Sequence, residues 1–149
     1  MKNISLRPAT IEDAQTILAW RNDPISRENS FSSDEISLEE HMRWMQKKLS
    51  DETCQMYLMS DGGEDVGQIR IDIIGQVGEI SYLIAPKYRG KGYGTDIIEQ
   101  YEKHADDRIS VLVGLVKSGN EASKRCFEKN SYIRLSGDGT DCYMKLINQ

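Results

Sequence analysis

The clearest potential for chemistry lies in a glycine-rich segment past the middle of the chain, residues 89–95, which reads Arg-Gly-Lys-Gly-Tyr-Gly-Thr. Three glycines at alternate positions allow backbone N–H groups to converge, because no Cβ atoms stand in the way. Converging N–H groups at the start of a helix bind phosphate or pyrophosphate. Arg89 and Lys91 add positive charge at the same place. The segment therefore predicts an anion-binding loop.

The flanking residues place this loop between a strand and a helix. Apolar side chains fall at every second residue from Ile80 to Ile84, which is typical of a strand, and Pro86 ends it. Residues 96–105 carry apolar side chains at helical spacing. A P-loop would need Gly-Lys-Ser/Thr after its second glycine, and a dinucleotide fingerprint would need Gly-x-Gly-x-x-Gly. Neither spacing is present, so the predicted ligand is another phosphate compound.

The pattern Arg/Gln-x-x-Gly-x-Gly/Ala, after a strand that closes with apolar-x-Pro, resembles the acetyl-CoA pyrophosphate loop of the GNAT superfamily of N-acyltransferases. The alternative is a tight turn that only joins strand to helix. The resemblance implies that the strand splays from its neighbour, so that its backbone pairs with the pantetheine amides and a backbone N–H near Leu83 meets the acetyl carbonyl. The cofactor-binding residues it implies in this half of the site are Leu83, Ile84, Arg89, Gly90, Lys91, Gly92, Tyr93, Gly94 and Thr95.

A second segment, residues 120–132, resembles the superfamily motif Asn-x-x-Ser/Ala-x-x-x-Tyr-Glu-Lys-x-Gly-Phe. The resemblance implies that Asn120 and Ser123 contact the pantetheine arm and that Phe127 lies beside the thioester sulfur. Phe127 stands where many members have a tyrosine that protonates the departing thiolate, and phenylalanine cannot donate a proton. Because thiol pKa values lie near 8.5, a proton donor helps but is not obligatory. Water, Tyr143 or Tyr132 remain open as donors.

Glu79 stands at the start of the strand before the loop, where many superfamily members carry a general base. An amine is mostly protonated at pH 7 and must lose a proton before or during its attack. A carboxylate can accept that proton directly or through water, and Ser81, on the same side of the strand, can hold the relay water. The alternative, a solvated acid at the end of a strand, stays open.

The segment before the sheet carries the predicted substrate residues: Arg21, Asn22, Phe31, His41 and Trp44. The arrangement Trp-Arg-Asn…Glu-His-x-x-Trp resembles the GNAT branch that acetylates nucleotide-linked amino sugars, and it is also similar to the ribosomal-protein N-acetyltransferases. A Trp face with Arg and His suits a sugar ring beside a diphosphate. The alternative is that Trp20, Trp44 and His41 are core residues between two helices.

The remaining elements follow from periodicity and from turn residues. Strands are predicted over 4–7, 54–59, 66–74, 79–84, 109–115, 132–135 and 142–147, and helices over 10–22, 37–49, 96–105 and 120–130. Residues 25–36 are predicted to be a polar connection. The order β-α-α-β-β-β-α-β-α-β-β is that of the GNAT fold, an α/β fold with a mixed, mostly antiparallel sheet flanked by about four helices. We expect a single domain over residues 1–149.

Composition excludes several classes of protein. The net charge of −5 argues against nucleic-acid binding, and no window approaches the roughly 18 apolar residues of a membrane span. The N-terminus has no apolar signal region, and Cys54, Cys126 and Cys142 have no metal-like spacing, which predicts reduced thiols in a cytoplasm. Two distant histidines predict no metal site. Either a monomer or a homodimer fits the sequence.

The function predicted from these features is an acetyl-CoA-dependent N-acetyltransferase in which a primary amine attacks the thioester directly. The predicted acceptor is a small amino sugar, in particular a nucleotide-linked one. A protein N-terminus or another small amine is the alternative acceptor. An alternative of another class is a catalytically silent acyl-CoA-binding domain, which the replacement of tyrosine by Phe127 makes conceivable.

Overall fold

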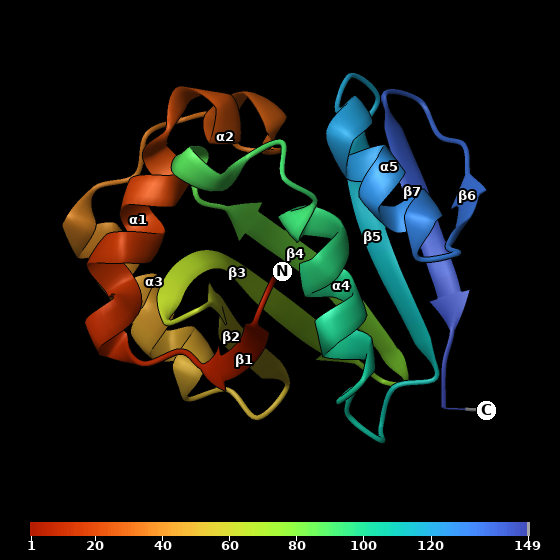
Figure 1. Ribbon diagram of the computed structural model, residues 1–149, viewed down its shortest axis with the longest axis horizontal. Helices are drawn as coiled ribbons and strands as arrows, with labels where there is room; N and C mark the ends of the chain where they lie inside the picture. Colours follow the sequence, from red (N-terminus) through yellow and green to blue (C-terminus); the bar gives the residue numbers. More distant parts are fainter. Residues whose placement is uncertain (149) are drawn as a thin grey trace.

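A single twisted sheet runs through the molecule in the computed structural model, which describes residues 1–148 (Figure 1). Seven strands follow the order β1-β2-β3-β4-β5-β7-β6. The strands are β1 (Ile4–Pro8), β2 (Cys54–Asp61), β3 (Glu64–Ile74), β4 (Val77–Ile84), β5 (Val111–Lys117), β6 (Ile133–Leu135) and β7 (Thr140–Leu146). The helices of this part of the chain are α1 (Ala14–Asn22), α2 (Pro24–Asn29), α3 (Leu38–Leu49), α4 (Tyr93–Glu102) and α5 (Glu121–Lys129).

The pairing between β4 and β5 is the feature of the sheet that matters most for the site. These two strands are parallel, whereas the other neighbouring pairs are antiparallel. Their pairing ends at Ile80 opposite Gly114. Strand β4 continues to Ile84 while it remains paired with β3. Beyond Ile80 the two strands therefore diverge, as Figure 1 shows, and one edge of β4 is left without a strand partner.

Two hydrophobic cores cover the two faces of the sheet. Adjacent residues of β2 illustrate this, because Leu58 and Met59 are both fully buried and belong to different cores. Alternate side chains of a strand point to opposite faces. The Met59 core includes Ile97 and Tyr101 of α4, whereas the Leu58 core includes Met45 of α3. Helices α4 and α5 thus cover one face of the sheet, and α1 and α3 cover the other.

Helix boundaries agree with the local capping signals. The Ser37 hydroxyl accepts from the Glu40 N–H at the start of α3, and Asn120 Oδ1 accepts from the Ser123 N–H at the start of α5. These two N-caps fix the starts of α3 and α5. A 3₁₀ turn over Ile11–Asp13 precedes α1, and a second one over Pro86–Tyr88 precedes the glycine loop.

One helix was not predicted, and the bounds of several predicted elements were wrong in detail. Helix α2 was not predicted, although the Asp23 carboxylate accepts from the first N–H groups of this helix and Pro24 occupies its first position. Asp23 followed by Pro24 is a typical helix start, but the residues after it are mostly polar and lack helical apolar spacing, so no helix was predicted. Helix α4 begins at Tyr93 and ends at Glu102, not over 96–105, and β5 begins at Val111, two residues later than predicted. The predicted order of the other elements and the single mixed sheet are confirmed.

Candidate active site

A cavity of about 740 Å³ lies where β4 and β5 diverge, and it reaches both faces of the sheet. The glycine loop and α5 line one end of it, and residues of α1, α3 and the sheet line the other. Most of the predicted site residues line this cavity: Arg21, Phe31, Trp44, Glu79, Ser81, Leu83, Ile84, Arg89, Gly90, Gly92, Tyr93, Gly94, Thr95, Asn120, Ser123 and Phe127. Asn22, His41, Lys91 and Tyr143 do not belong to its lining.

The glycine loop has the backbone geometry of an anion cradle. Gly90 and Gly92 have φ angles of +76° and +84°, a left-handed conformation that L side chains rarely adopt. Gly92 is also the N-cap of α4. The first N–H groups of a helix lack intrahelical acceptors, and the helix dipole is positive at that end. The N–H groups of Tyr93, Gly94 and Thr95 therefore offer donors to an anion at the cavity.

Arg89 and Lys91, the two charged residues of the loop, both make contacts with other parts of the chain. Arg89 forms an ion pair of 2.7 Å with Asp23, so it ties the loop to the start of α2. Lys91 accepts a hydrogen bond of 2.6 Å on its backbone carbonyl from Lys2 Nζ. The Lys2 ammonium also pairs with Asp96 at 2.7 Å and thereby neutralises the carboxylate in the first turn of α4. Sequence reasoning missed Lys2, because the contact spans nearly a hundred residues.

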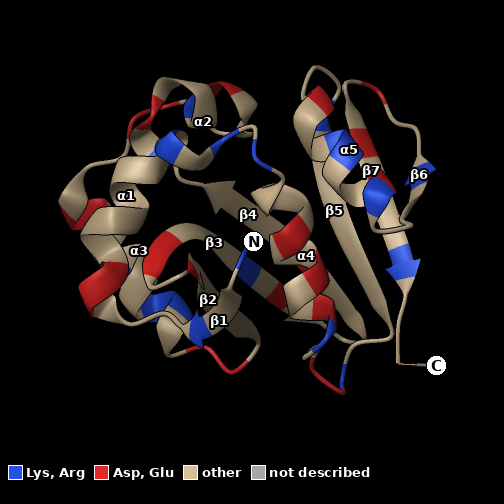
Figure 2. Ribbon diagram, viewed as in Figure 1, with Lys and Arg blue, Asp and Glu red and all other residues tan. Residues whose placement is uncertain are grey.

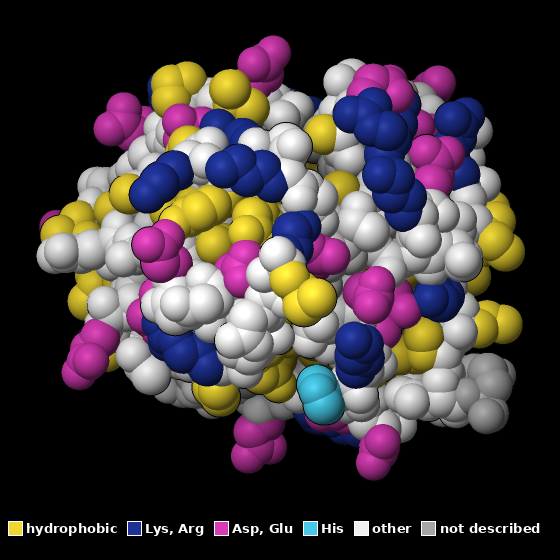
Figure 3. Space-filling view, viewed as in Figure 1, with side chains coloured by type: hydrophobic (Ala, Val, Ile, Leu, Met, Phe, Trp, Pro, Cys, Tyr) yellow, Lys and Arg dark blue, Asp and Glu magenta, His cyan; other side chains and the backbone are white. Residues whose placement is uncertain are grey.

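Two further cations line the cavity from α5. Arg125 and Lys129 belong to the lining, and neither forms an ion pair with any residue that the structure describes. Basic residues gather on α5 in the ribbon view and form a dark blue band in the space-filling view (Figures 2 and 3). Arg125 and Lys129 are four residues apart, which puts them on one face of α5, and this spacing can be read from the sequence. They supply the loop end of the cavity with positive charge.

A hydroxyl pair stands at the point where β4 and β5 diverge. The Tyr82 and Ser123 hydroxyl oxygens are 3.0 Å apart, and both residues line the cavity. Burial, followed by the nearby Cys126 thiol, raises the pKa of Tyr82, so its hydroxyl stays protonated. A Cβ atom at Gly94 would lie only 2.7 Å from Cys126 Sγ and 3.3 Å from the Tyr82 ring. The absence of a side chain at Gly94 lets α4 approach this cluster closely. Sequence reasoning missed Tyr82.

Phe127 packs flat against the sheet. A Cβ atom at Gly114 would lie 2.2 Å from its Cζ atom, so the ring occupies space that only glycine leaves free. The ring also stacks on Tyr143 at 5.6 Å and meets the edge of Tyr132 at 5.1 Å. Phe127 itself is 2% exposed. Its position beside the cavity agrees with the resemblance, but most of the ring belongs to the core.

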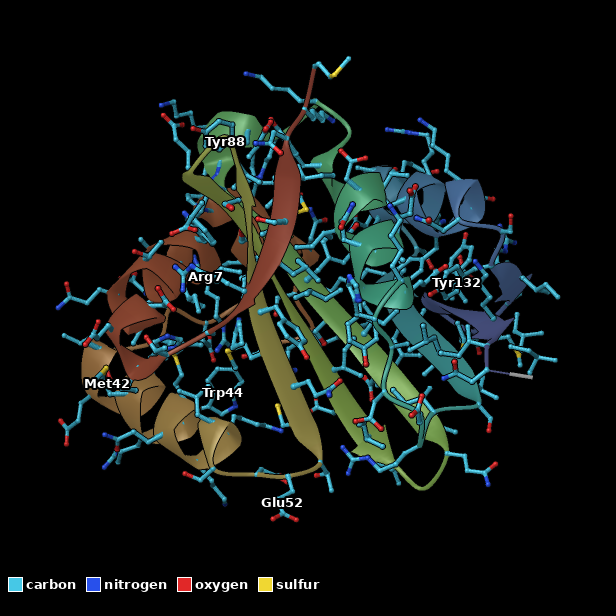
Figure 4. All side chains as sticks on the ribbon, turned by 60° about the horizontal axis from the view of Figure 1, so that its bottom comes forward. Arg7, Met42, Trp44, Glu52, Tyr88 and Tyr132 are labelled. Carbon is cyan, nitrogen blue, oxygen red and sulfur yellow. The ribbon has the colours of Figure 1, made fainter. Side chains whose placement is uncertain are left out.

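The two tyrosines considered as proton donors lie behind Phe127. Tyr143 is fully buried, and neither it nor Tyr132 belongs to the cavity lining. Their hydroxyl groups have no hydrogen-bond partner among residues 1–148, and burial is the main cause that raises the pKa of each. Figure 4 places Tyr132 on the α5 side of the molecule, far from Trp44. The structure thus brings Tyr82, rather than Tyr143 or Tyr132, to the cavity.

Glu79 and Ser81 point to the face of the sheet opposite α4. Both line the cavity, and Arg70, which faces Ser81 across the ladder, donates to its hydroxyl at 3.3 Å. Glu79 faces Asp72 in the same ladder. The side chains of these four residues lie on one face of β3 and β4, because paired residues share a face. A carboxylate and a hydroxyl therefore lie on the same face of the sheet at the second end of the cavity.

Trp44 forms the aromatic wall of this second end. It projects from α3 toward the sheet (Figure 4) and lies within 4.8 Å of the Arg21 guanidinium and 5.0 Å of that of Arg70. His41 stacks on Trp44 at 5.7 Å but is fully buried and lies outside the cavity lining. Burial and then the charge of Arg21 lower the pKa of His41. Its position supports Trp44 from behind.

The other two predicted substrate residues occupy different environments. Asn22 holds the segment before α3, because its side-chain amide donates to the Ile36 carbonyl at 2.8 Å and accepts from the Ile36 N–H at 2.9 Å. It therefore positions the wall of the cavity without lining it. Phe31 lines the cavity and is 60% exposed, which places it at the mouth.

Residues 1–148 contain no group of three or more His, Cys, Asp or Glu side chains arranged to hold a metal ion. Within the same range, no helix combines the length and apolar character needed to cross a membrane.

A splayed β4, a left-handed glycine loop at a helix N-terminus and a cavity that joins the two faces of the sheet define the class of acyl-CoA-dependent acyltransferases. The family model described as the acetyltransferase (GNAT) domain matches residues 3–132. The chain therefore belongs to the GNAT family and is an acetyl-CoA-dependent N-acetyltransferase. No curated protein matches the sequence significantly.

Several solved structures share the fold at low sequence identity. A spermidine N-acetyltransferase from Vibrio cholerae, in complex with CoA and spermine, has a TM-score of 0.83 at 17% identity, over 96% of this chain and 95% of that one. An aminoglycoside acetyltransferase in complex with CoA has a TM-score of 0.81 at 20% identity, over 97% and 95%. RimL, a ribosomal α-N-protein acetyltransferase, has a TM-score of 0.79 at 16% identity, over 97% and 94%. These similarities confirm the predicted fold.

Proposed function

We propose that the protein acetylates the primary amine of a small amino sugar, in particular a nucleotide-linked one. The observation that supports this acceptor most directly is Trp44, a large aromatic wall beside two arginines at the end of the cavity that also holds Glu79. Aromatic faces pack against the apolar faces of sugar rings, and arginines pair with phosphates. The cavity joins this end to the glycine loop, so an acceptor and a thioester can meet at the gap between β4 and β5.

In this proposal the glycine loop binds the pyrophosphate of acetyl-CoA. The backbone of Gly90, Gly92 and the first turn of α4 supplies the donors, and Arg125 and Lys129 supply charge. The backbone of β4 at Leu83 and Ile84 pairs with the pantetheine amides, since β5 does not pair with this edge. Asn120 and Ser123 line the same passage from α5.

The chemical step is a direct transfer. The neutral amine attacks the thioester carbonyl, an N–C bond forms, the C–S bond breaks, and CoA leaves as a thiolate. The proton of the amine passes to Glu79, directly or through a water held by Ser81. A backbone N–H near Leu83 stabilises the oxyanion. The thiolate takes a proton from water or from the Tyr82–Ser123 hydroxyl pair, whose oxygens are 3.0 Å apart.

The test is the release of free CoA thiol from acetyl-CoA with a panel of amines: amino sugars, nucleotide-linked amino sugars, peptides with free N-termini, and polyamines. An N-acetylated sugar, in which the amine is already blocked, is the matched control. We expect the highest kcat/KM for an amino sugar. A peptide or a polyamine as the best substrate would contradict the proposed acceptor and favour the alternatives.

A further inference from the structure

Two guanidinium groups contact the Trp44 indole ring at the second end of the cavity, which also holds Glu79 and is called the acceptor end below. Arg21 comes from the last turn of α1 and Arg70 comes from β3. Their guanidinium carbons lie 4.8 Å and 5.0 Å from the centre of the Trp44 ring, and all three residues line the cavity. Helix α3, which carries Trp44, thus brings together two positive charges that are far apart in the sequence.

The negative charges nearby do not neutralise both arginines. Arg70 pairs with Asp72 at 2.9 Å, and the same carboxylate also pairs with Lys48 at 2.9 Å. Arg21 forms no ion pair with any carboxylate that the structure describes. The other acid on this face is Glu79, which lines the cavity and carries the proposed role of base. One carboxylate therefore serves two cations, while Arg21 has none.

The charged form of Arg21 is disfavoured in the free protein, because the side chain is partly buried and has no carboxylate partner within residues 1–148. Burial, and then the charge of Arg70, lower the pKa of Arg21, which means that its surroundings disfavour the charged form. Buried charges are normally paired or bound to a ligand of opposite charge. The planar fork of arginine is suited to two parallel hydrogen bonds with a phosphate or carboxylate. The Trp44 ring holds the Arg21 guanidinium in the cavity, because cation–π contact attracts it to the face of the indole.

We infer that Arg21 and Arg70 form an anion-binding subsite, and that the acceptor carries a phosphate or carboxylate beside its reactive amine. This inference rests on the proposed function and narrows it. The anion binds at Arg21 and Arg70 against Trp44, and the amine faces Glu79. A zwitterionic acceptor matches both charges, whereas a polycation such as a polyamine meets two arginines that repel it.

The experiment compares three matched acceptors: glucosamine, glucosamine 1-phosphate and 2-amino-2-deoxyglucuronate. Each is measured for kcat and KM with wild type, with Arg21→Gln, and with Arg43→Gln as the control. Arg43 lies on α3 with 68% of its side chain exposed and forms only a surface pair with Glu39. We expect wild type to prefer an anionic acceptor by about tenfold or more in kcat/KM, mainly through KM. Arg21→Gln should abolish this preference, and Arg43→Gln should keep it.

Binding measured by calorimetry separates the two levels of the proposal. Glucosamine 1-phosphate that binds wild type more tightly than glucosamine, without turnover of either, would support the subsite and contradict amino-sugar acetylation. Turnover of glucosamine with no preference for either anionic form would support the proposed function and overturn the subsite. A preference that persists in Arg21→Gln would also overturn it. A preference for the phosphate over the carboxylate identifies which anion the subsite binds.

Discussion

The glycine loop allows a sharp test, because the backbone of Gly92 can be perturbed with a matched control. Gly92 has a φ of +84°, caps α4 and lines the cavity. An alanine there would hold a left-handed conformation at a cost of about 1–2 kcal/mol. Its methyl group would also lie 3.3 Å from Lys2 Nζ, closer than ordinary van der Waals contact. The substitution therefore strains the loop and pushes the Lys2 ammonium away from it.

The control is Gly63→Ala in the hairpin between β2 and β3. Gly63 has a similar φ of +92°, and a Cβ atom there would have nothing within 4 Å. It does not line the cavity. Both variants should lose a similar 1–2 kcal/mol of unfolding free energy, measured by urea titration, because the backbone strain is of the same kind.

Only Gly92→Ala should affect the ligand. We expect it to weaken acetyl-CoA binding, measured by calorimetry on the folded protein, by about tenfold or more, which corresponds to roughly 1.4 kcal/mol. Gly63→Ala should bind acetyl-CoA as wild type does. Equal affinities in the two variants would refute the assignment of this loop to the pyrophosphate. A loss of affinity in both variants would show that general destabilisation, rather than the loop, controls binding.

Three further predictions concern catalysis and stability. Glu79→Gln should lower kcat by about 10²-fold or more with little change in acetyl-CoA affinity, and this loss should shrink at high pH, where the amine is already neutral. The control is Glu52→Gln, which changes an exposed acid in a loop and should leave kcat unchanged. If Glu79→Gln has the kcat of wild type at pH 7, Glu79 is not the general base. Phe127→Tyr should change kcat by less than about threefold, under roughly 0.7 kcal/mol, and a larger gain would show that thiolate protonation limits turnover. The pKa of His41 is lower in the folded protein than in the unfolded chain, where it is about 6.5. Below about pH 6.5 the unfolded state therefore binds more protons than the folded state, and the free energy of unfolding should fall as the pH drops from 7 to 5. His41→Leu should flatten this dependence and the exposed His104→Gln should not, whereas an unchanged slope in His41→Leu would contradict the assignment.

Local patterns predicted the strand, the glycine turn and the helix at the loop end of the cavity. The strand, the glycine spacing and the helix are consecutive in the chain, so each signal could be tested against its neighbours. Contacts between distant segments could not be predicted in this way. Arg89 is a clear example: its type and position indicated a phosphate ligand, but the fold brings Asp23 within 2.7 Å of it. Lys2 reaches Asp96 for the same reason, through the packing of the N-terminal segment beside α4.

The acceptor end shows a second limit of sequence reasoning. A residue's type shows what it can do, whereas its direction depends on strand register and on helix packing. His41 and Trp44 share a face of α3, yet Trp44 reaches the cavity and His41 packs behind it. Tyr143 is paired with Gly114 in the sheet, which places its ring beneath Phe127 and away from the cavity.

Phe127, which replaces the usual tyrosine, packs between Gly114 of β5 and Tyr82 of β4, where the two strands diverge. Gly114 is the last β5 residue paired with β4, and its missing side chain lets the Phe127 ring lie on the sheet there. Tyr82 meets that ring edge-on at 6.2 Å from the β4 side. Two aromatic rings thus fill the space where the strands begin to diverge. The two rings pack against each other at the point where the pairing of β4 and β5 ends, beside the gap in which the proposed function places the thioester and the acceptor amine.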